Sequence, residues 1–187
     1  MNKIIILVLT IVLSLNTSCK KNDLKKSFQC NSNVSFSNTK TYQDILKHFK
    51  IDIPKSWKTN LHFDEFESEL YSADTSKQLS ETYIIDISWR QGELYFNEDF
   101  EKKINDNLTK EKLETINSGY GKFKDLPMYY IYAKGVNLKF DYHYVQVYVK
   151  YKPDEYYLFT TKFYGDQFID ERICSSFSLF EKIKFKK

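Results

Sequence analysis

The stretch KFDYHYVQVYVKY, residues 139–151, alternates aliphatic and aromatic side chains along most of its length. Because successive side chains of a strand point to opposite faces of a sheet, this alternation predicts a long strand with two different faces. Val145, Val147 and Val149 share one face, which is expected to pack into the core. The opposite face would carry Phe140, Tyr142, Tyr144, Gln146 and Tyr148.

Further strands are predicted on both sides of this one. Pro153–Asp154 forms a turn into a strand at residues 156–163, and residues 128–134 form a strand that ends at Gly135. Residues 57–73 are either a hairpin around Asp64–Glu65 or one long bent strand. Other strands are predicted at residues 49–54, 83–89 and 113–123. Strands that follow one another through short turns favour an antiparallel sheet.

A few segments have helical spacing instead. Asn97 is suited to cap a helix, because acidic residues follow it and an apolar stripe runs from Phe100 through Leu108. A final helix is expected to open at Asp166, before a short tail or edge strand at residues 179–187. Residues 41–49 are a short helical candidate. The fold class is therefore predicted to be α+β, mainly an antiparallel β-sheet with flanking helices.

The N-terminus has the pattern of an export signal. Lys3 precedes an apolar run at residues 4–13, and small and polar residues then lead to Cys19. The run is shorter than the roughly 20 apolar residues of a membrane-spanning helix. Residues 15–19 resemble a bacterial lipobox, which implies that Cys19 becomes the new N-terminus and carries fatty acyl chains such as palmitate. Ordinary secretion and a membrane helix are the alternatives.

This pattern divides the chain into three parts. We expect a lipoprotein signal peptide at residues 1–18, a flexible tether at residues 19–40 and a single α+β domain at residues 41–187. The tether is rich in Lys, Asn and Ser, and so has few apolar residues to bury. Two or three acyl chains on Cys19 would hold the protein stably on a membrane.

Charge and cysteine content narrow the possibilities further. Lys and Arg number 28 against 25 Asp and Glu, and several of the lysines lie in the tether, so the domain is close to neutral and nucleic acid is not an expected partner. With Cys19 assigned to lipid, Cys30 and Cys174 remain. An exported protein is able to form a disulfide between them. The alternative is a free buried cysteine at 174 and a mobile thiol at 30.

Four short motifs occur in an order that resembles a known family. They are Phe49-x-Ile51-x-Ile53-Pro54-x-x-Trp57, the acid-capped helix with Phe100, Leu126–Pro127 before a strand, and Ile173-x-x-Ser176-Phe177. Together they cover about residues 47–180 and resemble the PsbP-like α/β sandwich. That family includes extrinsic photosystem proteins, a nuclear Ran-binding protein and bacterial envelope lipoproteins. The resemblance implies the fold and the envelope lipoprotein branch, and it carries over no catalytic residue.

Little in the sequence indicates catalysis. Asp141 and His143 are two residues apart on the predicted strand and so share a face, where they would suit a general base or two metal ligands. The simpler interpretation is a surface ion pair, because no His-Glu-x-x-His, Cys-x-x-Cys or Gly-x-Ser-x-Gly motif accompanies them. We therefore expect no catalytic residue, metal site or cofactor.

Tyrosine and phenylalanine are unusually frequent, with 15 of each. Rigid aromatic side chains with one polar end are enriched at recognition surfaces. We expect the tyrosine face of residues 140–148 to continue onto neighbouring strands, through Tyr156 and Tyr164 on one side. The candidate binding surface consists of Tyr130, Tyr132, Tyr142, Tyr144 and Tyr148. A covering helix, or the plain preference of tyrosine for strands, is the alternative explanation.

The sequence thus predicts a non-enzymatic bacterial lipoprotein, anchored to a membrane of the cell envelope and facing the periplasm. Its role would be binding or assembly with an unidentified envelope protein. A small-ligand carrier with a tyrosine-lined cleft is the alternative, and a hydrolase using Asp141 and His143 is the least favoured. A concave tyrosine face would indicate a ligand, and a flat exposed one would indicate a protein partner.

Overall fold

The computed structural model describes residues 23–31 and 34–186 of the chain. The predicted signal peptide and Cys19, the predicted acylation site, lie outside the described residues. In the part that is described, the helices are 5, 13 and 12 residues long, and none of them could cross a bilayer.

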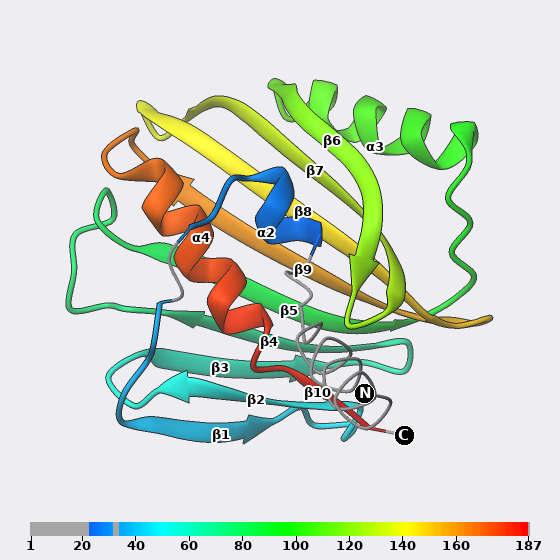
Figure 1. The fold of residues 1–187 in the computed structure, drawn as a ribbon, viewed down its shortest axis with the longest axis horizontal. Coiled ribbons are helices and arrows are strands. Elements are labelled where there is room, and N and C mark those ends of the chain that lie inside the picture. Colours follow the sequence, from blue (N-terminus) through cyan, green and yellow to red (C-terminus); the bar gives the residue numbers. More distant parts are fainter. Residues whose placement is uncertain (1–22, 32–33, 187) are drawn as a thin grey trace, which may run out of the picture.

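A seven-stranded antiparallel sheet forms the centre of the molecule (Figure 1). Its strands are β3 (Lys58–Phe63), β4 (Glu67–Ala73), β5 (Tyr83–Gln91), β6 (Leu113–Phe123), β7 (Leu126–Asn137), β8 (Phe140–Lys152) and β9 (Glu155–Tyr164). They lie in the order β3-β4-β5-β9-β8-β7-β6. The long strand predicted from the alternating stretch is β8, and the hairpin predicted around Asp64–Glu65 joins β3 to β4.

A second sheet of three strands consists of β1 (Thr39–Gln43), β2 (Phe49–Pro54) and β10 (Lys184–Phe185). The helix expected at residues 41–49 was therefore wrong, although the edge strand expected near the C-terminus is present. Residues 44–48 instead make a turn, in which the Asp44 carboxylate accepts a hydrogen bond from the Phe49 backbone amide at 2.6 Å. Pairing of β1 with β2 satisfies backbone groups that so short a helix would leave open.

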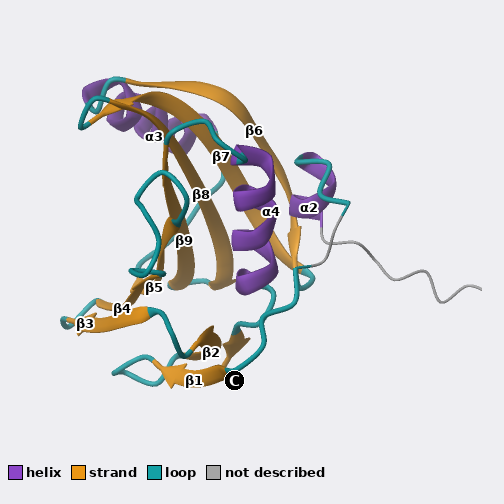
Figure 2. Ribbon diagram, turned by 90° about the vertical axis from the view of Figure 1, so that its left-hand side faces the viewer, coloured by secondary structure: helices purple, strands orange, loops and turns teal. Residues whose placement is uncertain are grey.

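The large sheet is covered on both faces (Figure 2). Helix α4 (Ile169–Phe180) and the small sheet pack on one face, and helix α3 (Glu98–Lys110) packs on the other. The core under α4 contains Val145, Val147 and Val149, all fully buried as predicted. The core under α3 contains Ile104 and Leu108. The prediction of an α+β fold with flanking helices is confirmed.

The segment expected to be a flexible tether is partly folded. Helix α2 (Asp23–Ser27) lies between β6 and α4, and Leu24 is fully buried in the core under α4. The disulfide between Cys30 and Cys174, with the two Cα atoms 5.4 Å apart, ties this segment to α4 and confirms the predicted bridge. The expectation of a flexible tether therefore fails at residues 23–28, because α2 buries Leu24 in the core, whereas the order at residues 29–31 is what a disulfide at Cys30 implies.

Candidate ligand-binding cleft

The tyrosine face of β8 is turned toward α3. Tyr142 and Tyr148 are buried there, and Tyr164 on β9 packs against Tyr142 with ring centroids 5.0 Å apart. Tyr129 on β7 lies directly opposite Tyr148 and joins the same core. The extension of this face through Tyr156 and Tyr164 is confirmed, because both residues pack against the core under α3.

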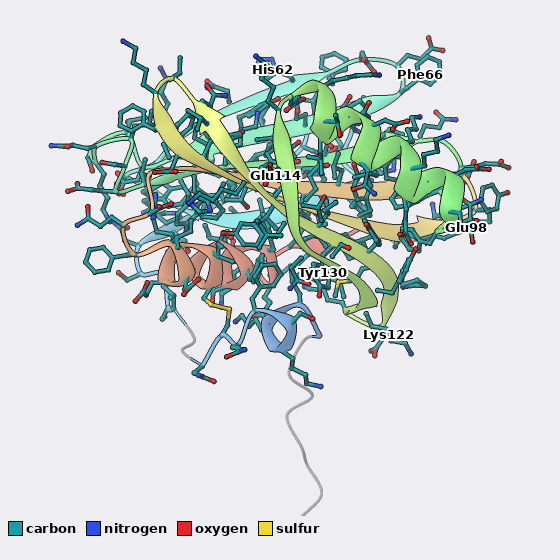
Figure 3. All side chains as sticks on the ribbon, turned by 90° about the horizontal axis from the view of Figure 1, so that it is seen from above. His62, Phe66, Glu98, Glu114, Lys122 and Tyr130 are labelled. Carbon is teal, nitrogen blue, oxygen red and sulfur yellow. A yellow bond between two sulfur atoms is a disulfide. The ribbon has the colours of Figure 1, made fainter. Side chains whose placement is uncertain are left out.

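Tyr130 and Tyr132 lie on the other face of the sheet, so their grouping with Tyr142, Tyr144 and Tyr148 was wrong. They are paired with Val147 and Val145, which point toward α4. Figure 3 shows Tyr130 on that side of the sheet. Both faces of β7 are buried, so its sequence has no polar side to show which way each tyrosine points.

Helix α3 covers part of the tyrosine face. The side chain of Asn97 accepts a hydrogen bond from the Phe100 backbone amide at 3.0 Å, which caps the helix as predicted. The Phe100 ring then meets the rings of Tyr129 and Tyr148 edge to face, at centroid distances of 5.2 and 5.1 Å. These tyrosines are therefore interior residues rather than a flat exposed patch.

Beside α3 the sheet is hollowed into a cleft of about 360 Å³. Tyr144 and Tyr148 form part of its wall, together with Ile104 and Leu108 of the helix. Polar side chains from four adjacent strands line the same sheet beside these tyrosines and form a polar wall. The remaining lining residues are Glu69, Tyr71, Asp86, Arg90, Asn107, Lys110, Glu111, Gln146, Leu158, Thr160 and Lys162. The cleft thus combines an apolar side with a dense polar side, as small-molecule sites commonly do.

The polar wall is set by strand register. Tyr71 lies opposite Asp86, Asp86 opposite Thr160, and Thr160 opposite Gln146, which makes one row across β4, β5, β9 and β8. Gln146 also accepts a hydrogen bond from the Tyr148 hydroxyl at 2.9 Å. Each member comes from a different strand, so the row exists only in the folded sheet.

Asp86 is the electrostatic centre of this row. Burial, together with the neighbouring carboxylate of Glu69, raises the pKa of Asp86 to about 8. Burial, together with the carboxyl groups of Glu69 and Asp86, also raises the pKa of Tyr71. One oxygen of Asp86 is enclosed and has no hydrogen-bond partner among the described residues. At neutral pH the cleft therefore holds a protonated carboxyl group that is able to donate a hydrogen bond.

Cationic side chains also line the cleft, among them Arg90 and Lys162. Arg90 forms an ion pair with Glu67, with its Nη2 atom 2.7 Å from the carboxylate. Lys162 acts on Asp86 in the opposite direction to Glu69, since its positive charge lowers the pKa of that carboxyl. The cleft therefore contains hydrogen-bond donors and acceptors, and both acidic and basic side chains, within a small volume.

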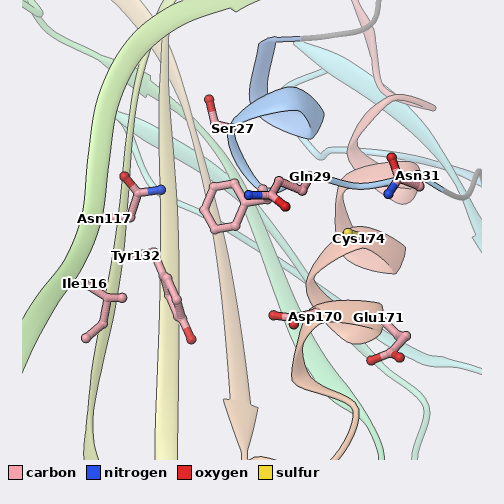
Figure 4. Close-up of a pocket in the computed structure, with 10 residues that line it drawn as sticks. Ser27, Gln29, Asn31, Ile116, Asn117, Tyr132, Asp170, Glu171 and Cys174 are labelled. Atoms are coloured by element: carbon pink, nitrogen blue, oxygen red, sulfur yellow. The ribbon is translucent and has the colours of Figure 1, made fainter.

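A larger groove of about 720 Å³ lies on the other side of the sheet (Figure 4). It is bordered by Gln29 after α2, by Ile116 and Asn117 of β6, and by Asp170 of α4. Tyr132 lines this groove and not the cleft beside α3, so this predicted binding residue is separated from Tyr144 and Tyr148. The groove is open, and it has a wall of mixed character rather than a ring of convergent polar groups.

The predicted pair of Asp141 and His143 does not form a unit. The Nε2 atom of His143 is 2.6 Å from Asp166, and its Nδ1 atom is 2.6 Å from the Tyr132 hydroxyl. Asp141 instead lies 3.5 Å from Lys134. The hydrogen bond from His143, reinforced by Lys134, lowers the pKa of Asp166. Because His143 is buried and both ring nitrogens are occupied, we interpret it as a structural link between β7, β8 and the loop before α4.

Sequence reasoning did not find Glu69, Tyr71 or Asp86. One signal was available for Asp86, since it interrupts the apolar run Ile84-Ile85-Asp86-Ile87 in the middle of a strand. A charged residue at such a position needs a partner or a function. Its partners could not be read from the sequence, because they depend on the pairing of β4 with β5.

The large antiparallel sheet is covered by α3 on one face and by α4 and the small sheet on the other. Solved structures with this architecture include cyanobacterial PsbP (CyanoP) from Synechocystis sp. PCC 6803, with a TM-score of 0.53 and 12% sequence identity over 83% of this chain and 96% of that chain. The fold is therefore PsbP-like, as the motifs indicated.

Two other solved structures are more distantly similar. PA94 from Pseudomonas aeruginosa matches with a TM-score of 0.48 and 9% identity, over 81% of this chain and 99% of that one. LpqN of Mycobacterium tuberculosis, which is involved in cell envelope biogenesis, matches with a TM-score of 0.46 and 6% identity, over 80% and 91% of the two chains. No family model matches the sequence, and no curated protein matches it.

Proposed function

We propose that the protein is a non-catalytic, lipid-anchored binding protein of the bacterial cell envelope, and that it holds a small ligand in the cleft beside α3. The observation that carries this proposal is the concave shape of the tyrosine face. Tyr144 and Tyr148 line a cleft of about 360 Å³ that also contains a row of polar side chains. A binding surface for a large protein partner would be flatter and more exposed.

The compartment is inferred from the N-terminal sequence and the cysteines. The apolar run at residues 4–13 and the lipobox-like residues 15–19 support export and acylation at Cys19. The disulfide between Cys30 and Cys174 supports an oxidising location such as the periplasm. Acyl chains on Cys19 would then keep the binding domain at the membrane surface.

A binding role is favoured over hydrolysis by the state of the ionisable groups. His143 has both ring nitrogens engaged, so it is not placed to act as a free general base. Asp86 is held in a protonated form beside Tyr71, which suits recognition of a ligand by hydrogen bonds.

The test is native mass spectrometry of the full-length protein purified from its own membranes in mild detergent. We expect a mass increase from acyl chains on Cys19 and a second, non-covalent increase from a bound small molecule. Gln146→Trp fills the cleft with a large ring and should abolish the non-covalent increase. Gln91→Trp places the same ring at an exposed end of β5 and should leave the increase unchanged.

Two results would contradict the proposal. A Cys19 without acyl chains would remove the anchor. A bound molecule that is retained equally by Gln146→Trp and Gln91→Trp would place the ligand outside the cleft. Circular dichroism of both variants establishes that each is folded before the comparison is made.

A further inference from the structure

We propose that a lysine-rich face around α2 lies directly on anionic phospholipid headgroups, so that the domain sits on the membrane in one orientation. The lysine-rich face is defined by the exposed side chains of Lys26, Lys122, Lys124, Lys182 and Lys184. This inference rests on the proposed acylation of Cys19. It adds that the domain is held against the bilayer rather than hanging from a long tether.

The first argument is the length of chain between the proposed anchor and the folded domain. Helix α2 begins at Asp23, so only Lys20, Lys21 and Asn22 separate it from Cys19. A fully extended chain covers at most about 3.6 Å per residue. The Cα atom of Asp23 therefore lies within roughly 14 Å of the Cα atom of Cys19. A tether that reached to residue 40 would allow about five times that distance.

The second argument is that α2 is fixed to the rest of the domain. Leu24 is fully buried, and the Nζ atom of Lys25 is 2.6 Å from the carboxylate of Glu181. The disulfide between Cys30 and Cys174 then joins the end of this segment to α4. Because α2 is unable to swing away, the side of the domain that carries it must be the side nearest the anchor.

The third argument is the charge of that side. Lys122 and Lys124 are at the turn between β6 and β7, and Lys122 lies on the same side of the sheet as α2 in Figure 3. The Nζ atom of Lys124 donates a hydrogen bond to the carbonyl of Ile183, which places this turn beside the segment that follows α4. Lys182 and Lys184 flank Ile183 in that segment, and both are exposed.

The acidic groups on the same side of the described domain include Glu181, Asp125 and, at the groove next to α2, Asp170 and Glu171. Glu181 is bonded to Lys25, and Asp125 is exposed at the turn between β6 and β7. Each lysine held near an anionic membrane surface increases binding roughly fivefold. Anionic lipid is therefore the partner that this face fits best.

The test measures which lysines the membrane covers. The acylated full-length protein is added to preformed vesicles of phosphatidylcholine, either alone or mixed with phosphatidylglycerol, and exposed lysines are acetylated briefly. We expect acetylation of Lys122, Lys182 and Lys184 to be at least about fivefold slower on the anionic vesicles. High salt should restore it, because salt screens exposed charges. Lys102 and Lys103, which are exposed on α3, are the controls and should react equally on both kinds of vesicle.

The same samples separate failure of this inference from failure of the proposed function. Acyl chains on Cys19 with equal acetylation of Lys122, Lys182 and Lys184 on both vesicles would overturn the orientation and leave the anchor intact. Absence of acyl chains would overturn the anchor itself. As a second measurement, Lys122→Gln/Lys182→Gln/Lys184→Gln should lose the faster capture by anionic vesicles, and Lys77→Gln/Lys102→Gln/Lys103→Gln should keep it. Capture that is equal for the two variants would contradict the inference.

Discussion

Asp86 shows how a single residue acquires its properties from strand pairing. It lies in the middle of β5, opposite Tyr71 on one side and Thr160 on the other, and Glu69 of β4 is close by. Burial and the nearby carboxylate both penalise its charged form. The folded protein therefore retains a proton at this position that the unfolded chain would release.

This retained proton makes the stability of the protein depend on pH. The pKa of Asp86 rises from 3.8 to about 8 on folding. Its contribution to the free energy of unfolding is therefore fully present below about pH 4 and is lost as the pH rises through 8. Asp86→Asn imitates the protonated form, so we expect it to be more stable than the wild type at about pH 9, by on the order of 2 kcal/mol.

Urea denaturation at a series of pH values checks this expectation. Asp106→Asn, at an exposed position on α3, is the matched control and should follow the wild type. If the difference between Asp86→Asn and the wild type were the same at about pH 5 and about pH 9, Asp86 would not be protonated in the folded protein.

At the scale of elements, the disulfide that links the segment after α2 to α4 is expected to contribute strongly to the stability of the fold. The disulfide closes a loop with a sequence separation of 144 residues. Long loops lose much conformational freedom when they are cross-linked, which raises the free energy of the unfolded chain. The bridge also keeps Leu24 and Phe28 in the core under α4, where the rings of Phe28 and Phe177 are 4.9 Å apart.

We expect Cys30→Ser/Cys174→Ser to lower the free energy of unfolding by roughly 2–5 kcal/mol, because the unfolded chain is no longer constrained. Hydrogen exchange at residues 24–31 should also become faster, since the disulfide is the covalent link that holds this segment against α4. Urea denaturation and peptide-level exchange are the measurements.

Reduced wild-type protein is the internal control for the double variant and should show the same loss. Unchanged stability together with unchanged exchange in α2 would mean that the segment is held by its apolar contacts alone.

At the scale of the whole molecule, the large sheet contributes side chains to two hydrophobic cores, one on each of its faces. Leu158 and Phe159 are neighbours on β9, yet Leu158 belongs to the core under α3 and Phe159 to the core under α4. Both tryptophans, Trp57 and Trp89, lie in the core under α4. A strand shared in this way should make the two cores unfold together.

Leu158→Ala tests this coupling across the sheet. We expect it to cost about 2–5 kcal/mol through the cavity that it leaves under α3. Although the substitution is in the other core, the unfolding midpoint followed by tryptophan fluorescence should fall together with that followed by circular dichroism. Phe159→Ala, in the same core as the tryptophans, should give coincident transitions as well. A tryptophan midpoint that Leu158→Ala leaves unchanged would show that the two cores unfold independently.

Much of the architecture could be predicted because its signals are local. The alternation in residues 139–151, the turn at Asp64–Glu65 and the cap at Asn97 each depend on residues close together in the chain. Residues 41–49 were misread for the opposite reason. Their short apolar pattern suits a helix as well as strands, and the decision depends on pairing with β2 and packing against α4.

The sequence alone was sufficient for the fold class and the two faces of β8, whereas it left the disulfide between Cys30 and Cys174 as one of two alternatives. Only the tertiary structure decided which tyrosines share a face and where the polar row of the cleft lies. The physical reason is that a buried central strand such as β7 is apolar on both sides, so its orientation follows from register with β8. The row from Tyr71 to Gln146 likewise depends on the alignment of four separate strands, a relation that no local pattern encodes.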